Sequence, residues 1–181
     1  ERRWINMKKY QDLLFDVDGT LLDFNAAERK ALVETLEHYG WPADAATQDL
    51  YRQINSQLWA ALERGEIKKD RLVVERFHRF IEGDAAQANR YYLDHLGSHA
   101  DVMPGALDAL RELAEVASLA VVSNGVARVQ YSRLEAAGIM PYMDEVFVSE
   151  KLGVEKPSRC DTLVMDSPCR RQALACWIFS R

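Results

Sequence analysis

The fold of this chain is decided by the stretch Leu13-Leu14-Phe15-Asp16-Val17-Asp18-Gly19-Thr20-Leu21-Leu22. Its first three residues are apolar, which is typical of a central parallel strand covered on both faces. Gly19 gives the backbone the freedom that a sharp turn needs just after this strand. The stretch therefore predicts a buried strand that carries two carboxylates, Asp16 and Asp18, to its carboxyl end, where open α/β sheets bind ligands.

Two acids at a strand end offer hard oxygen ligands, which suit Mg²⁺ and, through the metal, phosphate. The same residues also occur in ordinary acidic turns, so this spacing alone leaves both interpretations open. The choice between them depends on the rest of the chain.

The composition is that of a soluble globular protein, with 181 residues, 48% of them hydrophobic and 28% charged. The length allows one domain, or a core domain with an insertion. A formal net charge of -5 argues against nucleic acid as a partner, and no apolar run approaches the length of a membrane span. The start lacks the apolar segment of a secretory signal. The three cysteines, Cys160, Cys169 and Cys176, match no zinc pattern, so we expect free thiols and a cytoplasmic location.

Between residues 23 and 100, apolar residues recur at helical spacing in four successive patterns without a strand between them. Asn25, followed three residues later by Glu28, resembles the cap of the first helix. The second pattern places its apolar stripe at Leu50, Ile54, Leu58 and Leu62. Four helices in a row predict a helical insertion after the first strand. We expect it to cover the strand's carboxyl end and exclude water.

An alternation of helices and strands resumes at Met103. Apolar runs predict strands at 118–123 and 145–149, with helices before and between them. The first of these strands ends in Ser123-Asn124-Gly125, and a loop with Lys156 before Pro157 follows the second.

Together these strand ends offer the groups that phosphoryl transfer requires. A carboxylate can attack phosphorus and form an acyl-phosphate, while a lysine and Mg²⁺ offset the phosphoryl charge. A second carboxylate can protonate the leaving oxygen and later activate water. Taken singly, Ser123 could cap a helix and Lys156 could be a surface charge, but the set favours phosphate chemistry.

Asp16-Val17-Asp18-Gly19-Thr20, Ser123-Asn124-Gly125 and Lys156-Pro157 resemble the first three signature motifs of the haloacid dehalogenase (HAD) superfamily of phosphatases. The resemblance implies an α/β fold, with a Rossmann-like parallel sheet as the core and an inserted helical-bundle cap. The expected core comprises residues 7–22 and 101–181, and the expected cap residues 23–100.

The resemblance also implies the role of each site residue. Asp16 is expected to be the nucleophile and Asp18 the general acid and base. Ser123, Asn124 and Lys156 are expected to bind phosphate. The two aspartates are expected to hold Mg²⁺, with Asp18 acting partly through its main-chain carbonyl.

Within the superfamily, residues 59–67, Arg76-Phe77 and residues 149–157 resemble the noncanonical pyrimidine 5′-nucleotidase branch. A nucleotide substrate makes Trp59, Tyr91 or Tyr92 candidates for stacking on a base. The alternative is that these aromatic residues simply form the core of the cap.

Leu163-Val164-Met165-Asp166-Ser167 resembles the family's fourth motif and makes Asp166 a further expected metal ligand. Only residues 158–162 separate this stretch from Pro157, which is too short for a crossover between parallel strands. Either residues are missing here and around 168–173, or the chain is truly shortened and its metal site incomplete. Missing residues predict Cα separations well beyond about 3.8 Å between neighbours in the sequence.

We therefore expect a Mg²⁺-dependent phosphomonoesterase that acts through an aspartyl-phosphate, with a nucleoside 5′-monophosphate as substrate. The alternatives are a phosphatase for a sugar phosphate or phosphoglycolate, and a non-catalytic binding protein of the same fold. The expected partner is a small phosphorylated metabolite rather than a nucleic acid polymer or a membrane, and the protein is expected to be a monomer or homodimer.

Overall fold

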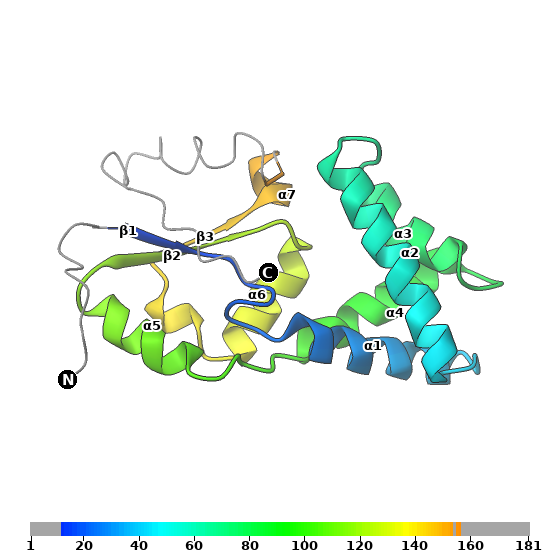
Figure 1. The fold of residues 1–181 in the computed structure, drawn as a ribbon, viewed down its shortest axis with the longest axis horizontal. Helices are drawn as coiled ribbons and strands as arrows, with labels where there is room; N and C mark the ends of the chain where they lie inside the picture. The colour runs from blue at the N-terminus through cyan, green and yellow to red at the C-terminus, as the bar shows by residue number, and fades with distance from the viewer. Residues whose placement is uncertain (1–11, 154, 157–181) are drawn as a thin grey trace. The chain divides into compact units, whose positions relative to one another are not determined.

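The computed structural model describes residues 12–153 and 155–156. The chain divides into two compact units, Glu1–Phe24 with Ala100–Arg181, and Asn25–His99. The first is an α/β unit and the second is helical (Figure 1). The short stretches at 158–162 and 168–173, where we expect long Cα separations, lie outside the described residues.

The α/β unit is built on a parallel sheet. Its described strands are β1 (Asp12–Phe15), β2 (Ser118–Ser123) and β3 (Glu145–Val148), in the order β1-β2-β3. Leu13 lies opposite Leu119, and Val121 lies opposite both Phe15 and Val146. The parallel α/β core predicted from the apolar runs is therefore confirmed.

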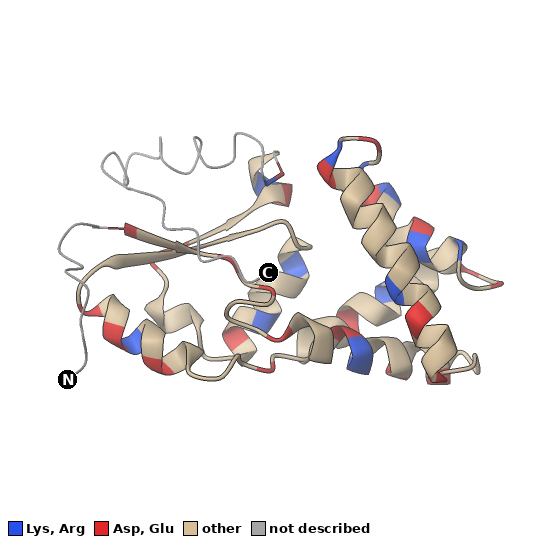
Figure 2. Ribbon diagram, in the orientation of Figure 1, with Lys and Arg blue, Asp and Glu red and all other residues tan. Residues whose placement is uncertain are grey.

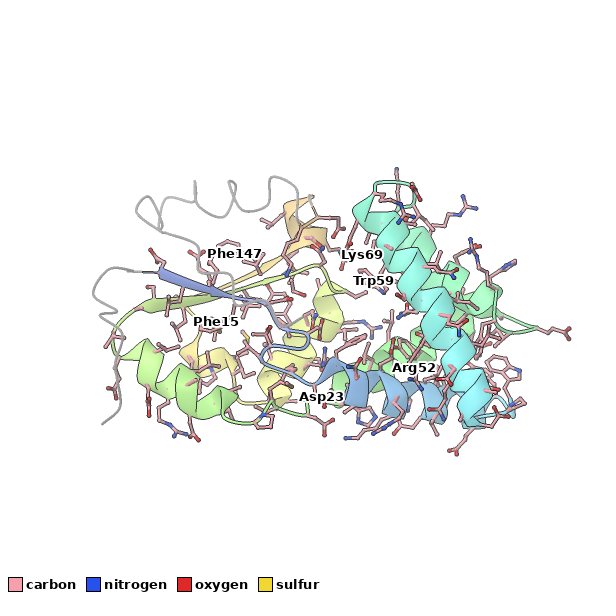
Figure 3. All side chains as sticks on the ribbon, viewed as in Figure 1. Phe15, Asp23, Arg52, Trp59, Lys69 and Phe147 are labelled. Atoms are coloured by element: carbon pink, nitrogen blue, oxygen red, sulfur yellow. The ribbon has the colours of Figure 1, made fainter. Side chains whose placement is uncertain are left out.

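Successive side chains of the strands point to opposite faces of the sheet. Helices α5 (Ala106–Ala114) and α6 (Ala127–Ala136) cover one face, where Phe15 packs in the same cluster as Leu110 and Leu134. Helix α7 (Ser149–Leu152) lies on the other face, where Leu152 and Phe147 pack against β1 and β2 (Figures 1 and 3). A short 3₁₀ helix, η2 (Met140–Tyr142), precedes β3. Burial on both faces explains why these strands read as continuous apolar runs.

The helical unit contains the four predicted helices, α1 (Phe24–His38), α2 (Ala45–Glu63), α3 (Lys69–His78) and α4 (Ala85–Ser98). Two of them begin at side-chain caps. The Asp44 carboxylate accepts a 2.9 Å hydrogen bond from the main-chain N–H of Thr47, and Asp84 accepts one of 2.9 Å from Gln87. These caps satisfy N–H groups that the first turn of a helix leaves without a partner.

Two expectations for the helical unit are wrong. Asn25 does not cap α1, because the helix already begins at Phe24 and Glu28 is buried inside the unit. Leu50 does not belong to the core of α2, because its exposed fraction is 49% and its neighbour Tyr51 is fully buried instead. Tyr51 packs against Phe77, with ring centroids 5.6 Å apart. A tyrosine ring buries more area than a leucine, which explains why Tyr51 is buried in place of Leu50, while Leu58 and Leu62 are buried as predicted.

Acidic and basic residues are interspersed along the helices rather than gathered by sign (Figure 2). Among the residues that the structure describes, no helix combines the length and apolar character needed to cross a bilayer.

Candidate active site

The loop after β1 places the two aspartates of the first motif. The main-chain carbonyl of Val17 accepts hydrogen bonds from the N–H groups of Leu21 and Leu22, both at 2.9 Å. Gly19 has a φ of 78°, a left-handed conformation that favours glycine, and its N–H donates to the Leu22 carbonyl at 2.8 Å. The chain therefore makes one tight turn at Asp18, directly after the strand end, as the sequence predicts.

Asp16 is held by a lysine from the far end of the described chain. Lys156 Nζ donates to Asp16 Oδ1 at 2.7 Å and to the main-chain carbonyl of Val122 at 2.8 Å. The N–H of Val17 donates to the same Asp16 oxygen at 2.8 Å. No hydrogen bond in the described part of the chain reaches Asp16 Oδ2. One carboxylate oxygen is thus fixed beside a cation, while the other is available to a ligand.

Asn124 holds Lys156 in turn. Its side-chain Nδ2 donates to the Lys156 carbonyl at 2.9 Å, and its Oδ1 accepts the Lys156 main-chain N–H at 2.7 Å. This reciprocal pair fastens the lysine loop to the end of β2. The side-chain amide of Asn124 therefore positions Lys156, and its expected contact with phosphate stays a prediction.

Ser123 is buried at the carboxyl end of β2. Its Oγ accepts hydrogen bonds from the Gly125 N–H at 3.0 Å and from Gln130 Nε2 at 2.9 Å. A hydroxyl has two acceptor positions and one hydrogen to donate. With both acceptor positions occupied, the Ser123 hydroxyl is prepared to act as a donor, which is the role that a phosphate oxygen requires.

Asp18 is held by two residues of α6 that the sequence analysis did not identify. Gln130 Nε2 donates to Asp18 Oδ2 at 2.6 Å, and Arg133 Nη1 donates to Asp18 Oδ1 at 2.5 Å. Both residues are buried, although each is strongly polar. They lie three positions apart, on the buried side of a helix that follows the Ser123 motif. Polar residues at buried helical positions are the signal that could have revealed them.

Metal binding is tested by the oxygen atoms at the strand end. In residues 12–153 and 155–156, no group of three or more His, Cys, Asp or Glu residues could hold a metal ion. Asp16 Oδ2 and the main-chain carbonyl of Asp18 are hard oxygen donors of the type that Mg²⁺ prefers, so they fit part of a magnesium site. Asp166 lies outside the described residues. The metal site of Asp16, Asp18 and Asp166 stays a prediction.

The structure separates the three aromatic residues considered for base stacking. Tyr92 is fully buried, with its ring centroid 5.4 Å from that of Phe77. Tyr91 is stacked between His38 and His95, with centroid distances of 4.0 Å to each. Trp59 on α2 is partly exposed and has no aromatic contact within the described residues (Figure 3). Of the three, Trp59 alone combines partial exposure with a ring that no described aromatic residue contacts.

Residues 13–163 match the family model for haloacid dehalogenase-like hydrolases. The chain is 37% identical over 158 residues to the HAD-hydrolase YfnB of Bacillus subtilis, a match that covers 84% of this chain and 67% of YfnB. A crystal structure of YfnB bound to magnesium superimposes with a TM-score of 0.83 at 35% identity, covering 88% of this chain and 75% of that one.

Two further relatives are pyrimidine 5′-nucleotidases. PynA of Streptococcus pneumoniae is 38% identical over 154 residues, which are 82% of this chain and 65% of PynA. YjjG of Escherichia coli is 27% identical over 154 residues, which are 83% of this chain and 68% of YjjG. The chain thus spans about two thirds of the length of the curated relatives it matches.

Proposed function

The chain belongs to the haloacid dehalogenase-like hydrolase family, and on this premise we propose that it is a Mg²⁺-dependent phosphatase of nucleoside 5′-monophosphates. The observation that carries the proposal is the 2.7 Å contact between Lys156 Nζ and Asp16 Oδ1. This contact joins residues 140 positions apart and leaves Asp16 with one oxygen beside a cation and one oxygen open to a ligand. That arrangement suits a carboxylate nucleophile facing an anionic substrate.

In the proposed reaction, Asp16 Oδ2 attacks the phosphorus atom. An O–P bond forms to Asp16 while the bond from phosphorus to the leaving oxygen breaks, giving an aspartyl-phosphate. Lys156 and the Ser123 hydroxyl offset the negative charge on the phosphoryl oxygens. When bound by Asp16, the Asp18 carbonyl and Asp166, Mg²⁺ supplies further charge neutralisation.

Asp18 moves the protons in both steps. Its carboxyl group protonates the leaving oxygen of the ester, and the resulting carboxylate then removes a proton from the water that attacks the aspartyl-phosphate. Water attack releases inorganic phosphate and restores Asp16. The proposal requires Asp18 to face the reacting group while its carboxylate is held by α6.

The nucleotide substrate is supported by the relatives PynA and YjjG, both pyrimidine 5′-nucleotidases. We propose that the helical unit determines which leaving group is accepted and that Trp59 stacks on the base. A small phosphorylated metabolite as partner and a cytoplasmic location belong to the same proposal. The alternatives, a sugar phosphate or phosphoglycolate phosphatase and a binding protein, are decided by the experiment below.

The test is phosphate release from pyrimidine and purine 5′-monophosphates, sugar phosphates and phosphoglycolate, with Mg²⁺ and with a chelator. We expect pyrimidine monophosphates to react fastest, and only with Mg²⁺. Asp16→Asn should lower kcat by at least about 10³-fold, because it removes the nucleophile. Full activity of Asp16→Asn would contradict the assigned nucleophile. No release from any ester by the intact protein with Mg²⁺ would favour the binding protein.

A further inference from the structure

We propose that Gln130 and Arg133 of α6 are positioning residues, which together orient the general acid and base Asp18 and the phosphate donor Ser123. The inference rests on the proposed function for the roles of Asp18 and Ser123. All four residues, Asp18, Ser123, Gln130 and Arg133, lie within the α/β unit.

Three side chains form a closed ring of hydrogen bonds. Gln130 Nε2 donates to Asp18 Oδ2 at 2.6 Å, and Arg133 Nη1 donates to Asp18 Oδ1 at 2.5 Å. The ring is completed by Arg133 Nη1, which also donates to Gln130 Oε1 at 3.3 Å. The amide nitrogen of Gln130 thus donates to an acceptor, and its amide oxygen accepts from a donor. These partners determine the orientation of the amide. The Asp18 carboxylate is held at both oxygens.

The same amide reaches the phosphate donor. Gln130 Nε2 carries two hydrogens, and its second partner is Ser123 Oγ at 2.9 Å. This contact, together with the Gly125 N–H, fills the acceptor positions of the Ser123 hydroxyl. One side chain therefore couples the orientation of Asp18 to that of Ser123.

The backbone is built around this amide. A Cβ atom added at Gly125 would lie 2.3 Å from Gln130 Nε2 and 2.7 Å from its Cγ, distances that side-chain atoms do not adopt. The glycine of the Ser123-Asn124-Gly125 motif thus leaves room for the Gln130 side chain. A close approach of this kind is a main reason for glycine at such a position.

The exposure of the ring members argues against a purely structural role. The Arg133 side chain is 1% exposed and Gln130 is buried, whereas the Asp18 side chain is 29% exposed. The two buried residues thus present a carboxylate that solvent and ligands can reach. An ion pair that only fastened α6 to the turn would need Arg133 but not the amide contact to Ser123.

The test uses leaving groups that differ in their need for a proton. A nucleoside 5′-monophosphate releases an alkoxide, which needs the proton of Asp18, whereas p-nitrophenyl phosphate releases a stable phenolate. Release in the first turnover isolates the step in which the leaving group departs. In Gln130→Ala we expect release of the nucleoside to slow by about 10²-fold and release of nitrophenol by less than about tenfold.

Arg133→Lys keeps the positive charge but replaces the planar fork of donors. We expect its release of the nucleoside to be slower than that of the unaltered protein and faster than that of Gln130→Ala. Release of nitrophenol should again be slowed less than release of the nucleoside. Val129→Ala, at a buried position of the same helix, is the matched packing control and should change both substrates equally or not at all. Equal slowing of both substrates in Gln130→Ala, or no slowing, would overturn the inference.

A second measurement separates this inference from the proposed function. Crystal structures of the unaltered protein and Gln130→Ala should differ in the Asp18 side-chain torsions and in the hydrogen bonds of Ser123 Oγ. If Asp18 and Ser123 keep their positions without the amide, the inference fails, whatever the activity. If the unaltered protein releases no phosphate from any ester, the proposed function fails, and the crystal structures still decide whether Gln130 orients these residues.

Discussion

Among the described residues, each unit of the molecule contains one arginine buried among polar side chains, and the two arginines have different roles. Arg133 lies in the α/β unit and bonds Gln130 and Asp18. Arg76 lies in the helical unit, where its Nη2 donates to Asn89 Oδ1 at 2.9 Å and its Nε donates to the Val73 carbonyl at 3.1 Å. Both guanidinium groups are almost completely removed from water. Burial of a charge alone therefore does not identify a functional residue.

The difference lies in where each network leads. The Arg76 network takes one residue from each helix of its unit, and all four are buried: Glu28, Asn55, Arg76 and Asn89. Its links include a 3.4 Å contact from Arg76 Nη1 to Asn55 Oδ1 and a 2.7 Å hydrogen bond from Asn55 Nδ2 to Glu28 Oε1. The Arg133 network instead ends at the partly exposed carboxylate of Asp18, two residues after Asp16 in the sequence. We infer that the first network holds four helices together and the second orients a reacting group.

Among the variants that compare the two arginine networks, Arg133→Met should have the largest effect. Removing the guanidinium releases one oxygen of Asp18, so we expect kcat for a nucleoside monophosphate to fall by about 10²–10⁴-fold, the range that positioned acid–base catalysis contributes. KM should change by less than about tenfold, because Lys156 and Ser123 remain. Steady-state kinetics at matched concentrations of folded protein provide the measurement. A variant with unchanged kcat would remove the distinction between the two arginines.

Most of the fold, and the positions of the candidate site residues at the strand ends, could be predicted from the sequence because they depend on local patterns. The apolar runs of β1 and β2 and the turn at Gly19 are properties of a few consecutive residues. Asp16 follows β1, Ser123 ends β2 and Lys156 lies in the loop after β3 and α7, so they could be predicted to lie together because the carboxyl ends of parallel strands meet at one edge of a sheet.

The two positioning residues could not be predicted in the same way. Gln130 and Arg133 contact Asp18 across 112 and 115 positions of sequence, and no local pattern specifies such contacts. The burial of Tyr51 instead of Leu50 on α2 could not be predicted for a related reason. Leu50 and Tyr51 are adjacent, and the rings of Phe77, Phe80 and Tyr92 around the buried position select the tyrosine.

Arg76→Met is the converse of Arg133→Met. It leaves the amide oxygens of Asn55 and Asn89 buried without this cation, so we expect the free energy of unfolding to fall by about 3–5 kcal/mol. Activity per folded molecule should stay within about twofold, because no member of this network belongs to the proposed site. Urea denaturation and active-site titration measure the two quantities. A loss of kcat with unchanged stability would reverse the roles that we assign to the arginines.

Gly125→Ala tests the α/β network without removing any of its polar groups. The backbone of Gly125 lies outside the left-handed region, so the strain of an added Cβ falls on the Gln130 side chain. We expect kcat to fall about tenfold, equivalent to ~1.4 kcal/mol in the barrier. In a Gln130→Ala background the same substitution should have almost no effect, because the clashing atoms are gone. Additive losses in the double variant would show that Gly125 acts independently of Gln130.

The smallest effect concerns the protons of the helical unit at high pH. Burial raises the pKa of Tyr51 to about 12, while the nearby Arg76 cation acts in the opposite direction. Burial also raises the pKa of Tyr92 well above its ordinary value. In the unfolded chain both hydroxyls ionise near pH 10. Above this pH the unfolded state therefore binds fewer protons than the folded state, and the free energy of unfolding falls as the pH rises towards 12.

The free energy of unfolding of the helical unit should fall more steeply with pH than the net charge of the whole chain alone would produce. Tyr51→Phe should make this slope shallower, because phenylalanine has no proton to lose. Urea denaturation at several pH values above 10 measures the slope, and phenolate absorbance counts the tyrosines that ionise before unfolding. The matched control is Tyr39→Phe, a partly exposed tyrosine of the same unit. If Tyr51→Phe and Tyr39→Phe lowered the slope equally, the desolvation of Tyr51 beside Arg76 would not govern stability at high pH.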